Sequence, residues 1–439
     1  MNFFQKELET MPRAELEALQ LERLKYIVDY CHRNVPFYRD RLDKAGVTAD
    51  KIKALSDIQY VPITTKEDIR DSYPYGLVAS PMKNVVRIHA SSGTTGKPTV
   101  VAYTKNDMEI WSDQVARVVV AGGATAEDIV QVSFGFGLFT GAMGLLQGLQ
   151  KLGATVIPVS SGNTDRQLMI MREWGVTGLV ATPSYATYLS EAARDSGHPM
   201  SEYALRWGFF GSEGCTPEMR AQIEKNFDGI FATDNYGMSE LMGPGVSGEC
   251  MIRDGLHFAE DHYLPEIIDS DTLQPLAPGA VGELVVTTLT KEGFPVLRYR
   301  TKDITRLNYD VCECGRTHVR MDKVMGRSDD MLIIKGVNVF PTQIESVLVG
   351  TNHIGPHYQL IVRRGKNFMD NLEVKVELID GSLLERYQAL EALQSDIHDR
   401  LKSVLGIETK VTLVEPKTLE RFQGKAKRVL DLRNDPDAK

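Results

Sequence analysis

The chain has 439 residues, a formal net charge of −9, 42% hydrophobic residues and 25% charged residues. This length is too great for one compact core and indicates a large domain with at least one smaller one. The acidic balance, without a concentrated basic stripe, argues against nucleic acid as a partner. Residues 1–20 lack the parts of a secretory signal, and no stretch approaches the ~20 consecutive apolar residues that span a bilayer. We therefore expect a cytoplasmic protein.

The N-terminal part of the chain predicts a helical scaffold. Apolar residues recur with a helical period between Leu16 and Tyr30. Thr64 to Asp68 has the form of an N-cap followed by an acidic first turn, so another helix is expected to begin there. Neither segment carries obvious chemistry.

A loop rich in glycine and hydroxyl groups follows this scaffold. The β-branched segments 85–88 and 100–103 enclose it, which predicts a strand, a tight loop and a second strand. Glycine lets a backbone approach a ligand closely, and hydroxyl groups can donate to phosphate oxygens. The loop residues expected to bind a nucleotide are Ser91, Ser92, Gly93, Thr94, Thr95, Gly96 and Lys97.

The spacing of this loop excludes a Walker-type phosphate loop. Only two residues separate Gly93 from Gly96, and Pro98 follows Lys97, whereas the Walker loop needs four residues between its glycines and Ser or Thr after the lysine. A surface turn of ordinary loop composition is the alternative interpretation.

Strands and helices alternate in the middle of the chain, which predicts an α/β fold. Parallel strands flanked by helices carry their ligand loops at the carboxyl ends of the strands. The expected helices are 107–120, 164–174 and 184–195, and the expected strands are 128–133, 154–159, 178–183 and 205–211, with another beginning at 230.

Aromatic rings alternate with glycines after the first of these strands, between Phe134 and Gly144. A flexible backbone with an apolar lining is suitable for one wall of a pocket. The residues assigned to an acid-binding pocket are Phe134, Phe136, Phe139 and Gly141. The alternative is a helix–strand packing site where glycine permits close contact.

Three loops contain polar residues after predicted strands, namely 211–214, 233–240 and 297–303. Glu240 in the second offers a carboxylate, the type of ligand that Mg²⁺ prefers, although a solvated surface acid is the alternative. Asp303 in the third offers two oxygens that can accept two hydroxyl groups.

The C-terminal part predicts a small α+β domain. A helix over 341–349, strands over 358–363 and 372–378, a mostly helical stretch over 383–405 and a strand over 410–414 follow one another. Lys425 then lies in a glycine-containing loop, with Lys427 as the second candidate for a functional lysine. Most lysines are only surface charges.

Five cysteines are too few for a disulfide scaffold in so long a chain. Three thiolates and one imidazole form a tetrahedral set suited to structural zinc, because four protein ligands leave no open position. The expected ligands are Cys250, His257, Cys312 and Cys314, with His262 and His318 as alternative nitrogen ligands. Buried free thiols are the alternative interpretation.

Several of these stretches resemble the adenylate-forming superfamily, which contains acyl- and aryl-CoA ligases, luciferases and carrier-protein adenylation domains. Residues 91–98 are similar to its phosphate-binding signature, 236–240 to its Tyr-Gly-x-Thr-Glu element with Ser239 for Thr, and 299–303 to its Tyr-Arg-Thr-Gly-Asp element with Lys302 for Gly.

Other details resemble the phenylacetate–CoA ligase branch in particular. These are His-Ala before the loop, Asn-Val-Pro-Phe-Tyr at 34–38, Gly-Leu-Phe-Thr-Gly at 137–141, Gly-Ser-Glu-Gly-Cys-Thr-Pro-Glu at 211–218 and Cys-Glu-Cys-Gly-Arg-Thr-His at 312–318. The likeness extends over nearly the whole chain.

The resemblance implies residue roles. Tyr236 would stack on adenine, Ser239 would touch the α-phosphate, Glu240 would hold Mg²⁺, Asp303 would accept the ribose hydroxyls, and Lys425 would reach the acid and the α-phosphate. The further nucleotide-binding residues expected are Ser212, Glu213, Asp234, Asn235, Gly237, Met238 and Arg327.

The resemblance also implies a domain division. A large N-terminal domain, 1–328, would bind ATP and the acid, and a small mobile lid, 329–439, would turn about a hinge at Asp329.

The implied activity is ATP-dependent ligation of an aryl acid to CoA through an acyl adenylate, with ATP, Mg²⁺, CoA and structural zinc and no nucleic-acid or membrane partner. A homodimer is one expectation. Phenylacetate, substituted arylacetates, indoleacetate and benzoate-like acids all remain candidates. The alternatives are an enzyme that loads an acyl group onto a carrier protein and a non-catalytic nucleotide-binding protein of the same fold.

Overall fold

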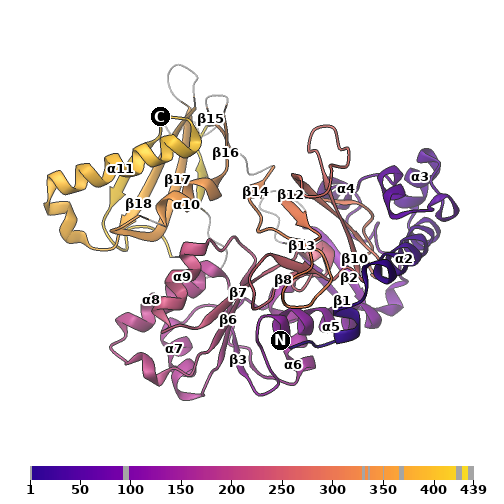
Figure 1. Cartoon of the computed structure of the whole chain (residues 1–439), viewed down its shortest axis with the longest axis horizontal. Coiled ribbons are helices and arrows are strands. Elements are labelled where there is room, and N and C mark those ends of the chain that lie inside the picture. The colour runs from indigo at the N-terminus through magenta and orange to yellow at the C-terminus, as the bar shows by residue number, and fades with distance from the viewer. Residues whose placement is uncertain are drawn as a thin grey trace. The chain divides into compact units, whose positions relative to one another are not determined.

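The computed structural model describes residues 2–91, 98–328, 332–334, 337–349, 351–364, 370–421 and 428–433. The chain packs as two units, which Figure 1 colours by residue number. The first unit comprises residues 1–182, 199–212 and 230–324, and the second comprises 183–198, 213–229 and 325–439. The expected domain boundary after residue 328 stays a prediction, because its hinge residue, Asp329, lies outside the described residues.

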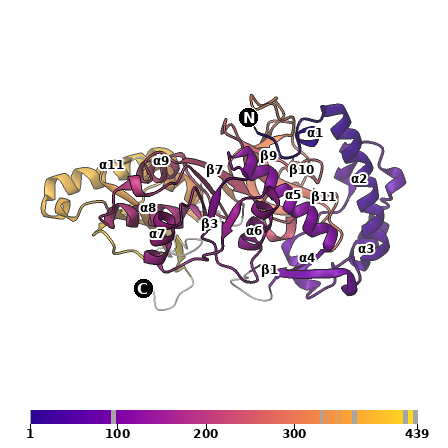
Figure 2. The same cartoon turned by 90° about the horizontal axis from the view of Figure 1, so that it is seen from below.

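The first unit contains helices at its N-terminus and on either side of its strands. The helices are α1 (Lys6–Glu9), α2 (Arg13–Asn34), α3 (Pro36–Ala45), α4 (Lys66–Asp71), α5 (Lys105–Ala121), α6 (Thr140–Leu152) and α7 (Thr164–Glu173). The helix expected near Thr65 is confirmed as α4, with the Thr65 hydroxyl accepting a 3.2 Å hydrogen bond from the Asp68 N–H. Helices α2 and α3 pack against each other, as both views show (Figures 1 and 2).

The strands of the first unit form a hairpin and one large sheet. They are β1 (Val85–Ala90), β2 (Val100–Thr104), β3 (Ile129–Val132), β4 (Thr155–Ile157), β5 (Gly178–Ala181), β6 (Trp207–Gly211), β7 (Phe231–Tyr236), β8 (Ser247–Glu249), β9 (Leu256–Phe258), β10 (Tyr263–Ile268), β11 (Val281–Thr288), β12 (Tyr299–Asn308) and β13 (Arg320–Met321). Strands β1 and β2 pair antiparallel, as the sequence predicts, and enclose the glycine-rich loop.

The large sheet is mixed, with a parallel part and an antiparallel part. Its order is β10-β11-β12-β13-β9-β8-β7-β6-β5-β3-β4. The pairs from β4 to β7 are parallel, which confirms the expected α/β part, and the pairs from β7 to β10 are antiparallel. Strands β5 and β6 are buried along their whole length, as expected for continuous apolar runs in a parallel sheet.

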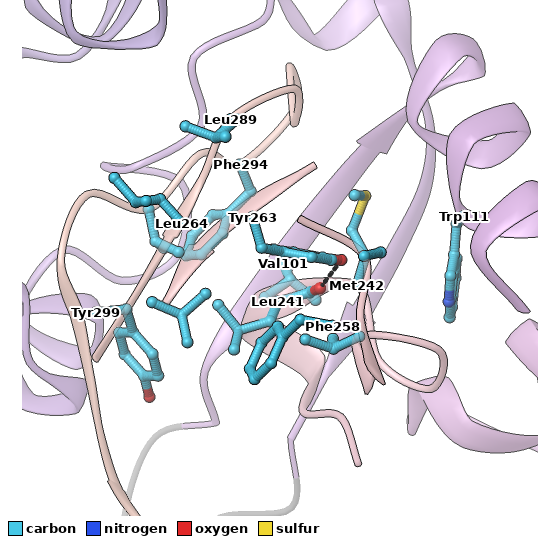
Figure 3. Packing of buried hydrophobic residues seen from close by; sticks show 14 of the residues in the cluster. Val101, Trp111, Leu241, Met242, Phe258, Tyr263, Leu264, Leu289, Phe294 and Tyr299 are labelled. Atoms are coloured by element: carbon cyan, nitrogen blue, oxygen red, sulfur yellow. Dashed lines mark hydrogen bonds between the residues drawn. The ribbon is translucent and has the colours of Figure 1, made fainter. Parts of the chain in front are cut away.

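Helix α6 occupies part of the stretch in which aromatic rings alternate with glycines. A Cβ at Gly144 would lie 2.3 Å from the Trp111 ring, and one at Gly148 would lie 2.3 Å from Val115. Both partners belong to α5, so the glycines allow the two helices to pack closely. These glycines therefore do serve close packing, but between two helices and not between the helix and strand that the sequence suggested. Trp111 belongs to the large apolar core of this unit (Figure 3).

The second unit joins a small sheet to helices from two regions of the chain. Its elements are α8 (Pro183–Asp195), α9 (Pro217–Asn226), β14 (Gly326–Arg327), β15 (Leu332–Ile334), β16 (Val337–Val339), α10 (Pro341–Leu348), β17 (Ile354–Arg364), β18 (Asp370–Leu378), α11 (Tyr387–Leu405), β19 (Lys410–Val414) and β20 (Val429–Asp431). The order β19-β18-β17-β20 confirms the expected α+β arrangement. Apolar residues of α10 and α11 form one core with this sheet.

Across the described residues, each helix is either too short or too polar to cross a bilayer.

Candidate active site

Two motifs that are far apart in the sequence meet in the first unit. Tyr236 is the last residue of β7, and Asp303 lies in β12. The Tyr236 hydroxyl donates a 2.6 Å hydrogen bond to Asp303 Oδ2. Asp303 is buried, and its own N–H donates to the Thr301 hydroxyl over 3.0 Å. A tyrosine ring and a carboxylate are therefore held side by side.

The loop that carries Asp303 has unusual backbone geometry. Lys302 has a φ of 70°, in the left-handed region that favours glycine. This explains why glycine is common at this position in the motif that the sequence resembles. Keeping lysine there costs about 1 kcal/mol of backbone energy, which the packed surroundings must offset.

Glu240 is buried beside the end of the glycine-rich loop. Its Oε1 accepts a 3.3 Å hydrogen bond from Thr99 Oγ1, and the same hydroxyl is hydrogen-bonded to Ser91 Oγ. In the described part of the chain, no cationic side chain forms an ion pair with the Glu240 carboxylate. A buried carboxylate without a salt-bridge partner is costly, so the position suits a bound cation.

Ser239 connects this region to the start of α6. Its hydroxyl lies 3.2 Å from Thr140 Oγ1, and both residues are buried. The Gly-Leu-Phe-Thr-Gly stretch therefore contacts the Tyr-Gly-Met-Ser-Glu stretch directly.

Asp234 and Asn235 make contacts that fasten β7 to its neighbours. The Asp234 N–H donates to Glu249 Oε2 over 2.8 Å, and its carboxylate lies 3.6 Å from Lys323 Nζ. Asn235 Nδ2 donates to the Phe210 carbonyl over 2.9 Å. These bonds fix the strand that ends in Tyr236, and a nucleotide contact by either side chain stays a prediction.

The neighbouring backbone is closely packed. A Cβ at Gly237 would lie 2.7 Å from Gly243 Cα, so this position requires glycine. Met238 is half-buried and packs against the core. Ser212 is exposed, with a φ of 75° directly after β6, and such strained residues cluster at functional sites.

Two expected nucleotide contacts belong to the second unit. Glu213 Oε1 accepts a 2.7 Å hydrogen bond from the Ser184 N–H at the start of α8. Arg327 is half-buried in β14. Their proposed contacts with a nucleotide stay predictions.

The residues assigned to the acid pocket differ in burial. Phe134 is buried in the core, and Phe136 is partly buried against it. Phe139 is 39% exposed, and its ring edge lies 2.5 Å from where a Cβ of Gly141 would be. Gly141 therefore makes room for this ring at the start of α6.

Several predicted residues lie outside the described part of the chain. They are Ser92, Gly93, Thr94, Thr95, Gly96, Lys97, Asp329, Lys425 and Lys427.

Lys291 is a buried residue near this site that the sequence did not reveal. Its Nζ donates a 3.0 Å hydrogen bond to the Glu240 carbonyl. Burial lowers the pKa of Lys291 to about 8, although the carboxylates of Asp107 and Glu240 favour the charged form. Thr99 and Thr140 were not predicted as site residues, although Thr140 belongs to the Gly-Leu-Phe-Thr-Gly stretch at 137–141; their contacts with Glu240 and Ser239 arise only in the folded chain.

A second cluster in the first unit has the composition of a metal site. One ligand atom from each of Cys250, His257, Cys312 and Cys314 lies within 4.8 Å of all the others, and all four residues are buried. The Cys250 and Cys312 sulfurs are 3.8 Å apart, and Cys314 Sγ is 3.4 Å from His257 Nε2. A tetrahedral zinc ion would give about 3.8 Å between two sulfurs and about 3.5 Å between sulfur and nitrogen.

The remaining hydrogen bonds distinguish His257 from the two alternatives. His257 Nδ1 lies 3.3 Å from the His318 carbonyl, which leaves Nε2 directed at the thiols. His318 bonds to the Phe258 and Leu8 carbonyls, and His262 bonds to Thr290 and Asp261. The arrangement therefore favours His257 among the three histidines.

Comparison with known proteins places this site in a family. The model of the AMP-binding enzyme family matches residues 16–290, and that of the AMP-binding enzyme C-terminal domain matches residues 336–433. The chain is 48% identical to the phenylacetate–coenzyme A ligase of Thermus thermophilus, covering 98% of this chain and 99% of the relative. It is also 48% identical to the phenylacetate–coenzyme A ligase of Escherichia coli, covering 97% of each chain.

A solved structure agrees with these matches. The crystal structure of 2-hydroxyisobutyryl-CoA ligase in the postadenylation state superimposes with a TM-score of 0.91 at 29% identity, covering 97% of this chain and 91% of that chain. The fold is therefore shared with a CoA ligase whose structure was determined in the postadenylation state. The chain belongs to the phenylacetate–coenzyme A ligase family of AMP-binding enzymes.

Proposed function

We propose that this protein joins a phenylacetate-like carboxylic acid to coenzyme A, with ATP cleaved to AMP and pyrophosphate. In the first half-reaction a carboxylate oxygen attacks the α-phosphate, which forms an acyl adenylate and releases pyrophosphate. In the second, the thiol of coenzyme A attacks the acyl carbon and releases AMP. The family membership supports this reaction, and the matched solved structure was determined with an acyl adenylate bound.

The contact between Tyr236 and Asp303 is the structural observation that best supports nucleotide binding at this site. It brings an aromatic ring next to a buried carboxylate, the two groups that a nucleoside requires. The carboxylate would accept both ribose hydroxyls, and the ring would stack on the adenine. The hydroxyl of Ser239, held near Thr140, would contact the α-phosphate.

The first half-reaction must neutralise charge, because an anionic carboxylate approaches an anionic triphosphate. Donors aimed at the place where charge develops lower such a barrier. The glycine-rich loop that begins at Ser91, together with Lys425, would supply these donors. Lys425 would be withdrawn when the small domain turns about Asp329 and coenzyme A enters.

Glu240 fits the requirements of the magnesium ion that this reaction uses. It is a buried carboxylate that accepts a hydrogen bond from Thr99, and among the described residues it forms no salt bridge. When bound there, Mg²⁺ would neutralise part of the triphosphate charge.

The cluster of Cys250, His257, Cys312 and Cys314 would hold a structural zinc ion. Four buried N and S ligands with the observed separations match a closed tetrahedral site. Such an ion would fasten the chain after β8 to the turn before β13 and take no part in the chemistry.

The acid would lie against the aromatic stretch that contains Phe134, Phe136, Phe139 and Gly141. An apolar pocket of this kind discriminates a single methylene by only ~1–3 kcal/mol, so related aryl acids would react at reduced rates. Phenylacetate is the acid that the names of the relatives support.

A substrate panel tests the proposal. Purified protein is supplied with ATP, Mg²⁺, coenzyme A and one acid at a time, and AMP and the thioester are measured. We expect equal amounts of both products, with phenylacetate giving the highest kcat/KM. Thioester formed only when coenzyme A is replaced by a pantetheinylated carrier protein would indicate a carrier-loading enzyme. The absence of AMP with every acid would refute the proposal.

A further inference from the structure

The three carbonyls of one turn beside the proposed metal carboxylate are each held by a buried side chain. Ser239–Leu241 forms a single 3-10 turn, and the last carbonyls of such a turn lack partners within it. The Tyr103 hydroxyl donates to the Ser239 carbonyl over 3.1 Å, Lys291 Nζ donates to the Glu240 carbonyl over 3.0 Å, and the Tyr263 hydroxyl donates to the Leu241 carbonyl. Figure 3 shows the last of these bonds as a dashed line.

These donors come from separate parts of the first unit. Tyr103 belongs to β2, Tyr263 to β10, and Lys291 to the segment after β11. Only Lys291 brings a full charge, and it has no exposed surface. A lysine without solvent is costly, so its position requires compensating contacts.

The surroundings of Lys291 fix its ammonium group in one place. Its Nζ lies 4.8 Å from the centre of the Tyr103 ring and 5.1 Å from that of Phe294, within the range of cation–π attraction. The carboxylate of Asp107 accepts hydrogen bonds of 2.7 Å from the Glu292 N–H and 2.8 Å from the Gly293 N–H. The segment that carries Lys291 is thus tied to the first turn of α5.

We infer that Lys291 is a positioning residue that orients Glu240 for the metal, an inference that rests on the function proposed above. Its ammonium donates a hydrogen bond to the backbone carbonyl of Glu240, and the side-chain carboxylate of the same residue would bind Mg²⁺. This hydrogen bond fixes the peptide plane on the C-terminal side of Glu240. It thereby fixes the direction in which the Glu240 side chain leaves the backbone. Lys291 itself touches neither the nucleotide nor the acid in this account.

Loss of the Lys291 hydrogen bond is expected to weaken Mg²⁺ binding in particular. A carboxylate that binds Mg²⁺ must meet a narrow octahedral geometry, because this small ion tolerates little distortion. When the hydrogen bond from Lys291 to the Glu240 carbonyl is lost, the 239–241 turn can rotate, and the Glu240 carboxylate spends less time in the orientation that binds Mg²⁺. The affinity for Mg²⁺ then falls, whereas general loosening of the core lowers stability alone.

Lys291→Met is the direct test, because methionine keeps most of the side-chain length and removes both the charge and the donor. Two measurements are made: acid-dependent ATP–pyrophosphate exchange at saturating ATP over a range of Mg²⁺ concentrations, and the Mg²⁺ dependence of ATP binding in the absence of acid, measured by isothermal titration calorimetry. We expect the Mg²⁺ concentration at half-maximal exchange to rise about tenfold, the size expected when a hydrogen bond to a charged donor is lost. Lys291→Gln keeps an N–H donor without the charge, so it should show a smaller rise, and it replaces Lys291→Met if that variant does not fold.

Leu289→Ala is the matched control for stability. Leu289 is buried two residues before Lys291 and contributes to the same core, but it donates nothing from its side chain to the turn (Figure 3). We expect this variant to lower the thermal midpoint without changing the Mg²⁺ dependence. A Mg²⁺ shift of the same size in Leu289→Ala would show that Lys291 acts only through stability and would overturn the inference.

Glu240→Gln separates failure of this inference from failure of the proposed function. If Glu240→Gln raises the Mg²⁺ requirement and the Lys291 variants do not, the positioning role is wrong and the metal assignment stands. If Glu240→Gln leaves the Mg²⁺ requirement unchanged, the metal assignment is wrong and the positioning role falls with it. A rise in both, absent from Leu289→Ala, supports the inference.

Discussion

The Tyr236 hydroxyl donates a 2.6 Å hydrogen bond to Asp303 Oδ2, joining β7 to β12. If Asp303 receives the ribose hydroxyls, Asp303→Asn should raise KM for ATP by about tenfold or more, because the amide can accept through one oxygen only. The same variant should lose the preference for ATP over 2′-deoxy-ATP. Steady-state kinetics with both nucleotides measure this.

Tyr236→Phe is the matched control for that prediction. It keeps the ring that would stack on adenine and removes only the hydroxyl donor to Asp303. We expect KM for ATP to rise less than in Asp303→Asn, because the lost hydroxyl only holds Asp303 in place, whereas the Asp303 carboxylate would bind the ribose itself. An unchanged KM in Asp303→Asn would exclude the ribose role.

Zinc content gives an independent prediction. Cys314→Ser should lose close to one zinc ion per chain, measured by elemental analysis of protein purified without chelator, and should lower the thermal midpoint. The reason is that serine is a poor zinc ligand and the remaining three residues would leave the closed site open. Cys31→Ala removes a buried thiol outside the cluster and should keep its zinc. Wild-type protein without zinc would contradict this prediction.

The free energy of unfolding at acidic pH should depend on His262. This buried ring contacts Asp261 at 3.2 Å and Thr290 at 2.8 Å. Burial lowers the pKa of His262 to about 4, with Asp261 opposing the shift. An ordinary histidine in an unfolded chain titrates near 6.5. Between these two values the unfolded chain binds a proton that the folded chain does not, so stability is lost as the pH falls.

The loss attributable to His262 is at most roughly 3 kcal/mol between pH 6.5 and pH 4. Urea unfolding of wild type and His262→Gln at pH 7 and pH 4.5 measures it. The variant should lose clearly less stability than wild type over this interval. Equal losses in the two proteins would show that His262 does not resist protonation in the folded state.

Close packing of α5 and α6 should make Gly148 intolerant of alanine. A Cβ there would lie 2.3 Å from Val115 and 3.1 Å from the Ala116 nitrogen. Overpacking costs about 1–3 kcal/mol, which exceeds the roughly 1 kcal/mol that alanine gains over glycine in a helix. We expect Gly148→Ala to lower the free energy of unfolding. Gly137→Ala, which would meet nothing within 4 Å, should leave it almost unchanged.

Local sequence patterns account for much of the fold. The apolar runs of β3, β5 and β6 predicted buried parallel strands because such strands exclude water from both faces. Helix α6 was not predicted, because Gly144 and Gly148 weaken its helical pattern. Glycine is needed at these two positions because the side chains of Trp111 and Val115 lie against them, and these contacts exist only in the folded chain.

The residues of the candidate site could be predicted where they belong to a sequence motif, and not elsewhere. Spacing suggested the zinc ligands, but the choice of His257 depends on the antiparallel pairing of β9 with β8 and β13. Lys291 looks like any surface lysine in the sequence. Its burial results from the Phe294 ring nearby in the chain and from the Tyr103 ring and the Glu240 carbonyl, which are distant in the sequence.

The most direct test of the proposed reaction follows an oxygen atom. Phenylacetate labelled with ¹⁸O in both carboxylate positions is converted with ATP and coenzyme A, and the products are analysed by mass spectrometry. Because a carboxylate oxygen attacks the α-phosphate and remains on it when the thiol displaces AMP, we predict one ¹⁸O in AMP and none in pyrophosphate. Unlabelled AMP, with the label in a phosphate released from the end of the triphosphate, would contradict the acyl-adenylate route.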